Sequence, residues 1–110
     1  MTLDQETRGE VAILRPVGRL DSSTSPALER AVLDRLEEGC KQMVFDLADM
    51  DYVSSAGLRV ILLAGKKLRT VHGKLVLAGM REVVHEVFEM SGFLTLFAVA
   101  PNLDEALAKV

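Results

Sequence analysis

The chain has 110 residues, of which 49% are hydrophobic and 26% are charged, and this size accommodates one domain over residues 1–110 with no room for a second. Its 13 basic and 16 acidic side chains give a formal net charge of −3, and this lack of a basic surplus argues against direct binding to nucleic acid. Cys40 is the only cysteine, so neither an intramolecular disulfide nor a cysteine-based zinc site can form.

The N-terminal segment predicts a β-hairpin. Residues 11–17 are apolar and rich in β-branched side chains, as in a strand, and a shorter strand over residues 3–7 precedes them. The turn between the two strands is expected at Arg8-Gly9. Pro16 has no backbone N–H to donate, so we expect it on an edge strand or at a strand end.

A polar segment then leads into a helix predicted over residues 26–38. Ser25 is the expected N-cap, and Pro26 suits the first helical turn, where the missing N–H would have no partner. Gly39 fits the left-handed position that often follows a helix. The nearly continuous apolar run within residues 42–50 predicts a central strand that is covered on both faces.

The second half of the chain repeats this alternation of helix and strand. Its periodicity predicts, in chain order, a helix over 56–72, a strand over 74–79, a helix over 81–92, a strand over 94–100 and a helix over 102–110 that Asn102 caps. The complete order β-β-α-β-α-β-α-β-α is typical of the α/β class. We therefore expect a mostly parallel mixed β-sheet packed with about four α-helices.

Binding sites in such sheets gather at the carboxyl ends of the strands, where loops lead into helix N-termini. The segment DMDYVSSAG, residues 49–57, occupies that position between the central strand and the second helix. A helix start stabilises anions, so Ser54 or Ser55 could carry a phosphoryl group there. Serine is also a common N-cap worth about 1 kcal/mol over alanine, so one of the two serines could have this structural role alone.

Motifs for enzymatic chemistry do not occur in the sequence. It contains no G-x-S-x-G nucleophile elbow, no G-x-x-x-x-G-K-[ST] phosphate loop and no dinucleotide fingerprint. We therefore expect no enzyme, no catalytic residue, no metal site and no cofactor. The polar N-terminus lacks a signal-peptide pattern, and no apolar run approaches the roughly 20 residues of a membrane span, so we expect a cytoplasmic protein without membrane insertion.

Three segments resemble the STAS domain of the bacterial anti-sigma factor antagonists. Residues 11–32, VAILRPVGRLDSSTSPALERAV, resemble that family's second strand, its G-x-L-D turn and its first helix. Residues 43–62, MVFDLADMDYVSSAGLRVIL, resemble the central strand and the serine-bearing loop, and residues 76–93, VLAGMREVVHEVFEMSGF, the fourth strand and the following helix. The similarity spans essentially the whole chain, which implies a single STAS-type domain.

The resemblance implies a binding module that regulates transcription by partner switching. In that family a partner that is both anti-sigma factor and serine kinase phosphorylates a serine at the start of the second helix, the modified antagonist no longer binds, and a phosphatase resets it. Alignment on Gly57-Leu58 makes Ser55 the acceptor, with Ser54 as second choice. The implied partner-binding residues are Asp21, Ser54, Ser55, Gly57 and Leu58.

The loop departs from the family pattern D-S-S/T-G-L at two positions. Ser54 stands where the family has Asp, and Ala56 stands where it has a second hydroxyl. The missing carboxylate favours an alternative function, a STAS interaction module that is not phosphorylated and belongs to a stressosome-like or lipid-transport assembly. A small enzyme or nucleotide-binding protein that uses the same loop as an anion site is a third hypothesis, supported only by the generic helix start.

Overall fold

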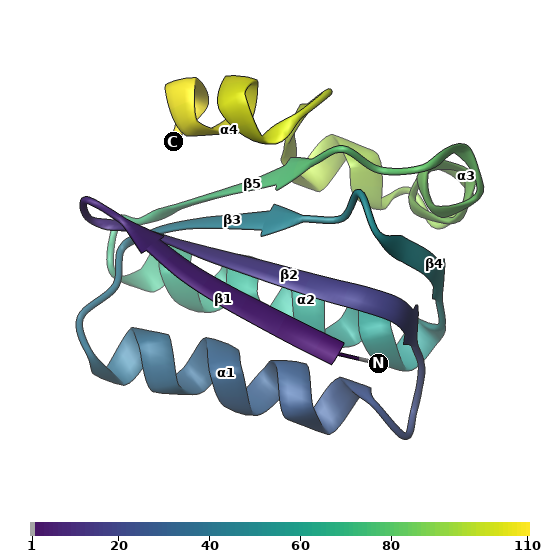
Figure 1. Ribbon diagram of the computed structural model, residues 1–110, viewed down its shortest axis with the longest axis horizontal. Helices are drawn as coiled ribbons and strands as arrows, with labels where there is room; N and C mark the ends of the chain where they lie inside the picture. Colours follow the sequence, from purple (N-terminus) through teal and green to yellow (C-terminus); the bar gives the residue numbers. More distant parts are fainter. Residues whose placement is uncertain (1) are drawn as a thin grey trace.

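The computed structural model describes residues 2–110 (Figure 1). Its strands are β1 (Thr2–Arg8), β2 (Val11–Leu20), β3 (Gln42–Asp46), β4 (Met50–Val53), β5 (Lys74–Ala78) and β6 (Ala98–Ala100). Its helices are α1 (Ser25–Glu37), α2 (Ser55–Thr70), α3 (Glu82–Met90) and α4 (Leu103–Lys109), with a 3₁₀ turn, η1, at Phe93–Leu96.

The strands form one mixed sheet in the order β1-β2-β3-β5-β6. Only β1 runs antiparallel to its neighbour, and every other pair is parallel. The sheet branches at β2, because its first half pairs with β3 and its last residues pair with β4. The prediction of an α/β fold with a mostly parallel mixed sheet and about four helices is confirmed.

Helices cover the two faces of the sheet unequally. Figure 1 shows α1 and α2 side by side on one face, α4 on the opposite face and α3 beside β4. The strand pleat sorts the side chains accordingly, since Met43 and Phe45 of β3 join the core under α1 and α2 while Val44 joins the smaller cluster under α4. The central strand is therefore buried on both faces, as its apolar run predicted.

Local signals set several element boundaries as expected. Gly39 adopts the left-handed φ of 91° just after α1, a conformation that glycine reaches without steric cost. Asn102 caps α4 by accepting a hydrogen bond from the Glu105 N–H at 2.9 Å. The N-cap prediction for Ser25 is wrong: Thr24 is the N-cap of α1, and Ser25 is its first residue and is buried.

Three strand predictions also differ from the structure. Residues 50–53, predicted as loop, form β4, which lies beside β2. Residues 94–96, predicted as strand, belong to the 3₁₀ turn η1. Pro16 lies inside β2 rather than at an edge or an end, at the point where the strand changes its partner from β3 to β4, so that it interrupts neither ladder.

Candidate functional site

The site is built where two neighbouring parallel strands end. Leu20 of β2 and Val53 of β4 are paired in register, and each is the last residue of its strand. Asp21 and Ser54 come directly after them, so the two loops leave the same edge of the sheet together. The Ser54 N–H donates a hydrogen bond to the Leu20 carbonyl at 2.9 Å, which ties the serine loop to the strand that precedes Asp21.

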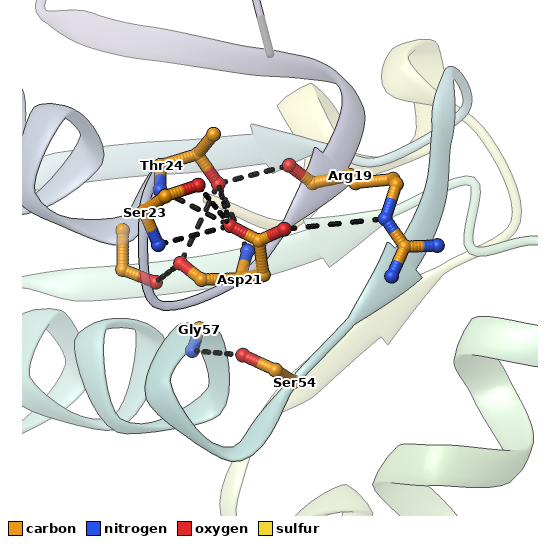
Figure 2. A network of polar contacts seen from close by, with 7 residues as sticks. Arg19, Asp21, Ser23, Thr24, Ser54 and Gly57 are labelled. Atoms are coloured by element: carbon orange, nitrogen blue, oxygen red, sulfur yellow. Dashed lines mark hydrogen bonds and ion pairs between the residues drawn. The ribbon is translucent and has the colours of Figure 1, made fainter.

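The two serines of the loop have different environments. Ser54 is the N-cap of α2, with φ −93° and ψ 175°, and its hydroxyl oxygen accepts a hydrogen bond from the Gly57 N–H at a long 3.4 Å (Figure 2). Ser55 is the first residue of α2 and is exposed. Of the two arrangements that the sequence left open, the structure therefore has Ser54 as the cap, with Ser55 facing solvent.

Gly57 allows the start of α2 to approach β2 closely. A β-carbon at Gly57 would lie 2.8 Å from Leu20 Cγ and 3.0 Å from the Leu20 carbonyl oxygen, closer than atoms can pack. Leu58 is 7% exposed and belongs to the main core. Gly57 and Leu58, which the resemblance placed among the partner-binding residues, are therefore buried and support the loop from beneath instead of forming its exposed surface.

Asp21 organises the turn between β2 and α1. Its Oδ1 accepts hydrogen bonds from the Ser23 hydroxyl at 2.7 Å, the Ser23 N–H at 3.0 Å and the Thr24 N–H at 3.2 Å (Figure 2). These bonds, above all that from the Ser23 hydroxyl, lower the pKa of the Asp21 carboxyl below its ordinary value. Its Oδ2 lies 3.9 Å from Arg19 Nε. Asp21 thus stays ionised at neutral pH, with one oxygen turned toward an exposed cation.

Two residues at this edge were missed by the sequence analysis. The guanidinium of Arg19 lies 4.3 Å from the centre of the Tyr52 ring, a cation–π contact between residues that are paired across β2 and β4. Tyr52 is 38% exposed and the Arg19 side chain 64% exposed. Arg and Tyr are enriched at protein interfaces. An exposed tyrosine in an otherwise weakly aromatic chain was the available signal, but its arginine partner became evident only with β4.

The exposed and half-buried polar and aromatic residues at this edge of the sheet are together called the serine face: Arg19, Asp21, Tyr52, Ser54 and Ser55. It combines an aromatic ring, a cation, an anion and two hydroxyls around a helix start.

Within residues 2–110, the structure has no group of three His, Cys, Asp or Glu side chains arranged to hold a metal ion. None of the helices over these residues has the length and apolar character needed to cross a membrane. The serine face offers polar and aromatic groups for contact with a partner.

Comparisons with known proteins agree with this architecture. The family model described as "STAS domain" matches residues 2–106. BtrV of Bordetella bronchiseptica, whose name describes it as a candidate anti-sigma factor antagonist, is 42% identical over 108 residues, which cover 98% of this chain and 91% of BtrV.

Solved structures show the same fold. The crystal structure of an anti-sigma factor antagonist from Mycobacterium paratuberculosis superposes with a TM-score of 0.91 at 26% identity, covering 99% of this chain and 92% of that one. A candidate anti-sigma factor antagonist from Thermotoga maritima gives a TM-score of 0.93 at 22% identity, covering 98% and 93%. Family model, relative and fold all agree, and this chain belongs to the STAS domain family.

Proposed function

We propose that this chain is an anti-sigma factor antagonist that binds an anti-sigma factor with serine kinase activity through the serine face. Phosphorylation of Ser55 switches the binding off, and a phosphatase restores it. The proposal is supported by family membership over residues 2–106 and by the 42% identity to a relative named for this function.

The exposure of Ser55 is the observation that carries the proposal. A kinase must reach the acceptor hydroxyl, and Ser55 is exposed at the first position of α2 while Ser54 is half-buried and engaged as the cap. In the proposed transfer, Ser55 Oγ attacks the γ-phosphorus of ATP, the bond to the β-phosphate oxygen breaks, and the hydroxyl proton passes to a base of the kinase. ADP leaves, and the antagonist itself needs no catalytic group.

A phosphate on Ser55 would leave the fold intact but would prevent the serine face from binding its partner. It adds about −1.5 to −2 charges at pH 7, and the unpaired N–H groups and dipole at the start of α2 favour an anion there. The same charge on the exposed Ser55 must lose its water or be repelled by acidic groups when a partner covers the serine face. The expected result is a folded protein that has lost its affinity.

The test uses the purified partner kinase of this proposal, ATP and intact-mass spectrometry. The wild-type chain and Ser54→Ala should each gain one phosphate, and Ser55→Ala should gain none. Ser54→Ala is the matched control because it removes the adjacent hydroxyl and leaves Ser55 in place. Uptake of phosphate by Ser55→Ala at the wild-type rate would show that another residue is the acceptor.

A binding measurement tests the switch itself. Ser55→Glu should keep the melting temperature of the wild type and bind the partner at least about tenfold more weakly, because a charge is buried at the interface. Ser55→Gln, of similar size and without charge, is the control and should bind more tightly than Ser55→Glu. Equal affinity of the two variants would contradict a switch based on charge.

One observation favours a second candidate, a constitutive STAS interaction module of a stressosome-like or lipid-transport assembly. Ser54 stands where the family loop has Asp, so no carboxylate next to Ser55 is available to orient its hydroxyl. In this case the serine face binds its partner without phosphate chemistry. Mass spectrometry of the protein purified from its native host separates the two, since phosphate on Ser55 excludes the constitutive module.

A further inference from the structure

A cavity of about 300 Å³ opens between the second half of α2, strand β5 and the segment that joins η1 to β6. Its apolar walls include Leu62 of α2, Leu75 of β5, Leu96 at the end of η1, and Phe97, which joins η1 to β6. Leu96 is 50% exposed, so this apolar surface is open to solvent and not sealed in the core. The cavity lies on a different part of the fold from the serine face.

The apolar wall is held in place by the core. The Phe97 ring packs edge-on against the buried Phe88, with ring centres 6.3 Å apart. Gly65 of α2 leaves room for this ring, since a β-carbon there would lie 3.0 Å from Phe97 Cε1. The wall is therefore formed before any ligand arrives, which lowers the ordering cost of binding.

Cations surround the apolar wall. Lys66, Arg69 and Lys74 line the cavity, and no acidic residue does. None of the three forms an ion pair with another residue of the described chain, although acidic side chains outnumber basic ones in the sequence. Lys74 Nζ donates a hydrogen bond to the Lys109 carbonyl at 2.6 Å, at the end of α4, so the cations left for the cavity are Lys66 and Arg69. The cavity thus joins an apolar interior to unneutralised positive charge.

We propose that this cavity binds a small amphiphilic anion, with a medium-length alkyl chain against Leu62, Leu75 and Phe97 and a carboxylate or phosphate head near Lys66 and Arg69. The volume is at the lower end of the range of ligand pockets, about 300–1,000 Å³. Charge complementarity requires an anionic head, and the apolar walls require a tail.

This site is separate from the proposed switch. Lys66 follows Ser55 by eleven residues on the same helix, which corresponds to about 16 Å along its axis. Ligand binding can therefore be measured on the isolated, unmodified chain, and its outcome does not depend on the acceptor assignment.

The experiment titrates the ¹⁵N-labelled chain with decanoate, decyl phosphate and decanol, each below its micelle concentration. We expect saturable amide shifts at residues 62–75 and 96–98 for at least one of the two anions, with an affinity at least about tenfold higher than for decanol. The stronger of the two anions identifies the head group. Equal affinity for decanol and both anions, or no saturable shift with either anion, overturns the proposal.

Variants locate the head group. The double variant Lys66→Gln/Arg69→Gln should weaken binding of the anion about tenfold, with each exposed charge contributing a few-fold. Lys67→Gln is the matched control, because Lys67 is an exposed cation of the same helix that does not line the cavity. Circular dichroism melts verify that the variants are folded. Equal loss of affinity in the control and the double variant, or no loss in either, overturns the assignment.

Discussion

The starts of α1 and α2 lie next to each other, follow paired strands and both contain serines, but they use their polar groups differently. At α1, Ser25 is 5% exposed and donates its hydroxyl hydrogen to the Asp21 carbonyl oxygen, and the Thr24 hydroxyl donates to the Arg19 carbonyl at 2.9 Å. At α2, the Ser54 hydroxyl makes one long hydrogen bond, and the Ser55 side chain makes none to any residue of the described chain.

This difference separates a structural hydroxyl from one that is available for chemistry. Satisfied, buried hydroxyls such as that of Ser25 hold a turn together and are out of reach of another protein. The Ser55 hydroxyl is exposed and contributes nothing to the local hydrogen bonding, so a kinase could modify it without cost to the fold. Four measurements of the free energy of unfolding test this contrast between the two helix starts.

The largest loss of stability is expected at Gly57, where the start of α2 packs against Leu20, the last residue of the strand that leads to α1. Gly57→Ala should destabilise the protein by about 1–3 kcal/mol, because the new methyl group collides with the side chain and backbone of Leu20. Gly65→Ala is the control on the same helix, where the three nearest atoms to the added carbon all belong to side chains, at 3.0 Å or more. Urea denaturation measures the free energy of unfolding of both variants. Equal losses would show that the close contact with Leu20 does not add to the cost of the methyl group.

Ser25→Ala should cost about 1 kcal/mol. It removes the buried hydroxyl that donates to the Asp21 carbonyl, a typical net contribution for one hydrogen bond. The exposed neighbour Ser23→Ala is a useful comparison, because Ser23 also bonds Asp21 but from the surface. If Ser25→Ala lowers the free energy of unfolding by less than Ser23→Ala does, burial does not strengthen the hydrogen bonds at the start of α1.

Ser54→Ala should cost only about 0.5 kcal/mol, at the low end for an N-cap, because its bond to the Gly57 N–H is long. Ser55→Ala, one residue further on, should leave the free energy of unfolding unchanged in the same urea titration. A larger cost for Ser55→Ala than for Ser54→Ala would reverse the roles assigned to the two serines.

The smallest effect on the free energy of unfolding is expected from the titration of Asp21 at acidic pH. The folded pKa of Asp21 lies below its ordinary value of 3.8, so this carboxylate contributes stability at higher pH and loses that contribution as the pH falls below 3.8 through the folded pKa. Asp21→Asn removes the titration, so the stability difference between wild type and variant should shrink in that window. Urea titrations from pH 6 to about pH 2 test this, and a constant difference would contradict the lowered pKa.

Much of the fold followed from local patterns in the sequence. Alternating helical and strand periodicity placed α2, β5 and α3 to within a few residues, and Gly39 and Asn102 marked boundaries through their own backbone preferences. Such signals act within one or two helical turns, so they are present in the sequence whatever the rest of the chain does.

Other features depended on partners that are distant in the sequence. β4 is only four residues long with both ends buried and its middle exposed, so it shows no strand alternation, and pairing with β2 alone makes it a strand. Thr24 rather than Ser25 is the N-cap; Asp21, only three residues earlier and directly after β2, accepts the Thr24 N–H, so this boundary depends on where β2 ends. These choices depend on where another strand ends.

The same division applies to the two sites. Local patterns in SSAGL are enough to predict that two serines precede a helix after a strand, because capping and periodicity are local properties. The packing of the folded chain was needed to show that Ser54 caps and Ser55 faces solvent, that Gly57 and Leu58 are buried, and that Arg19 contacts Tyr52. The reason is physical: exposure and pairing depend on the parallel register of β2 and β4, which brings together residues more than thirty positions apart.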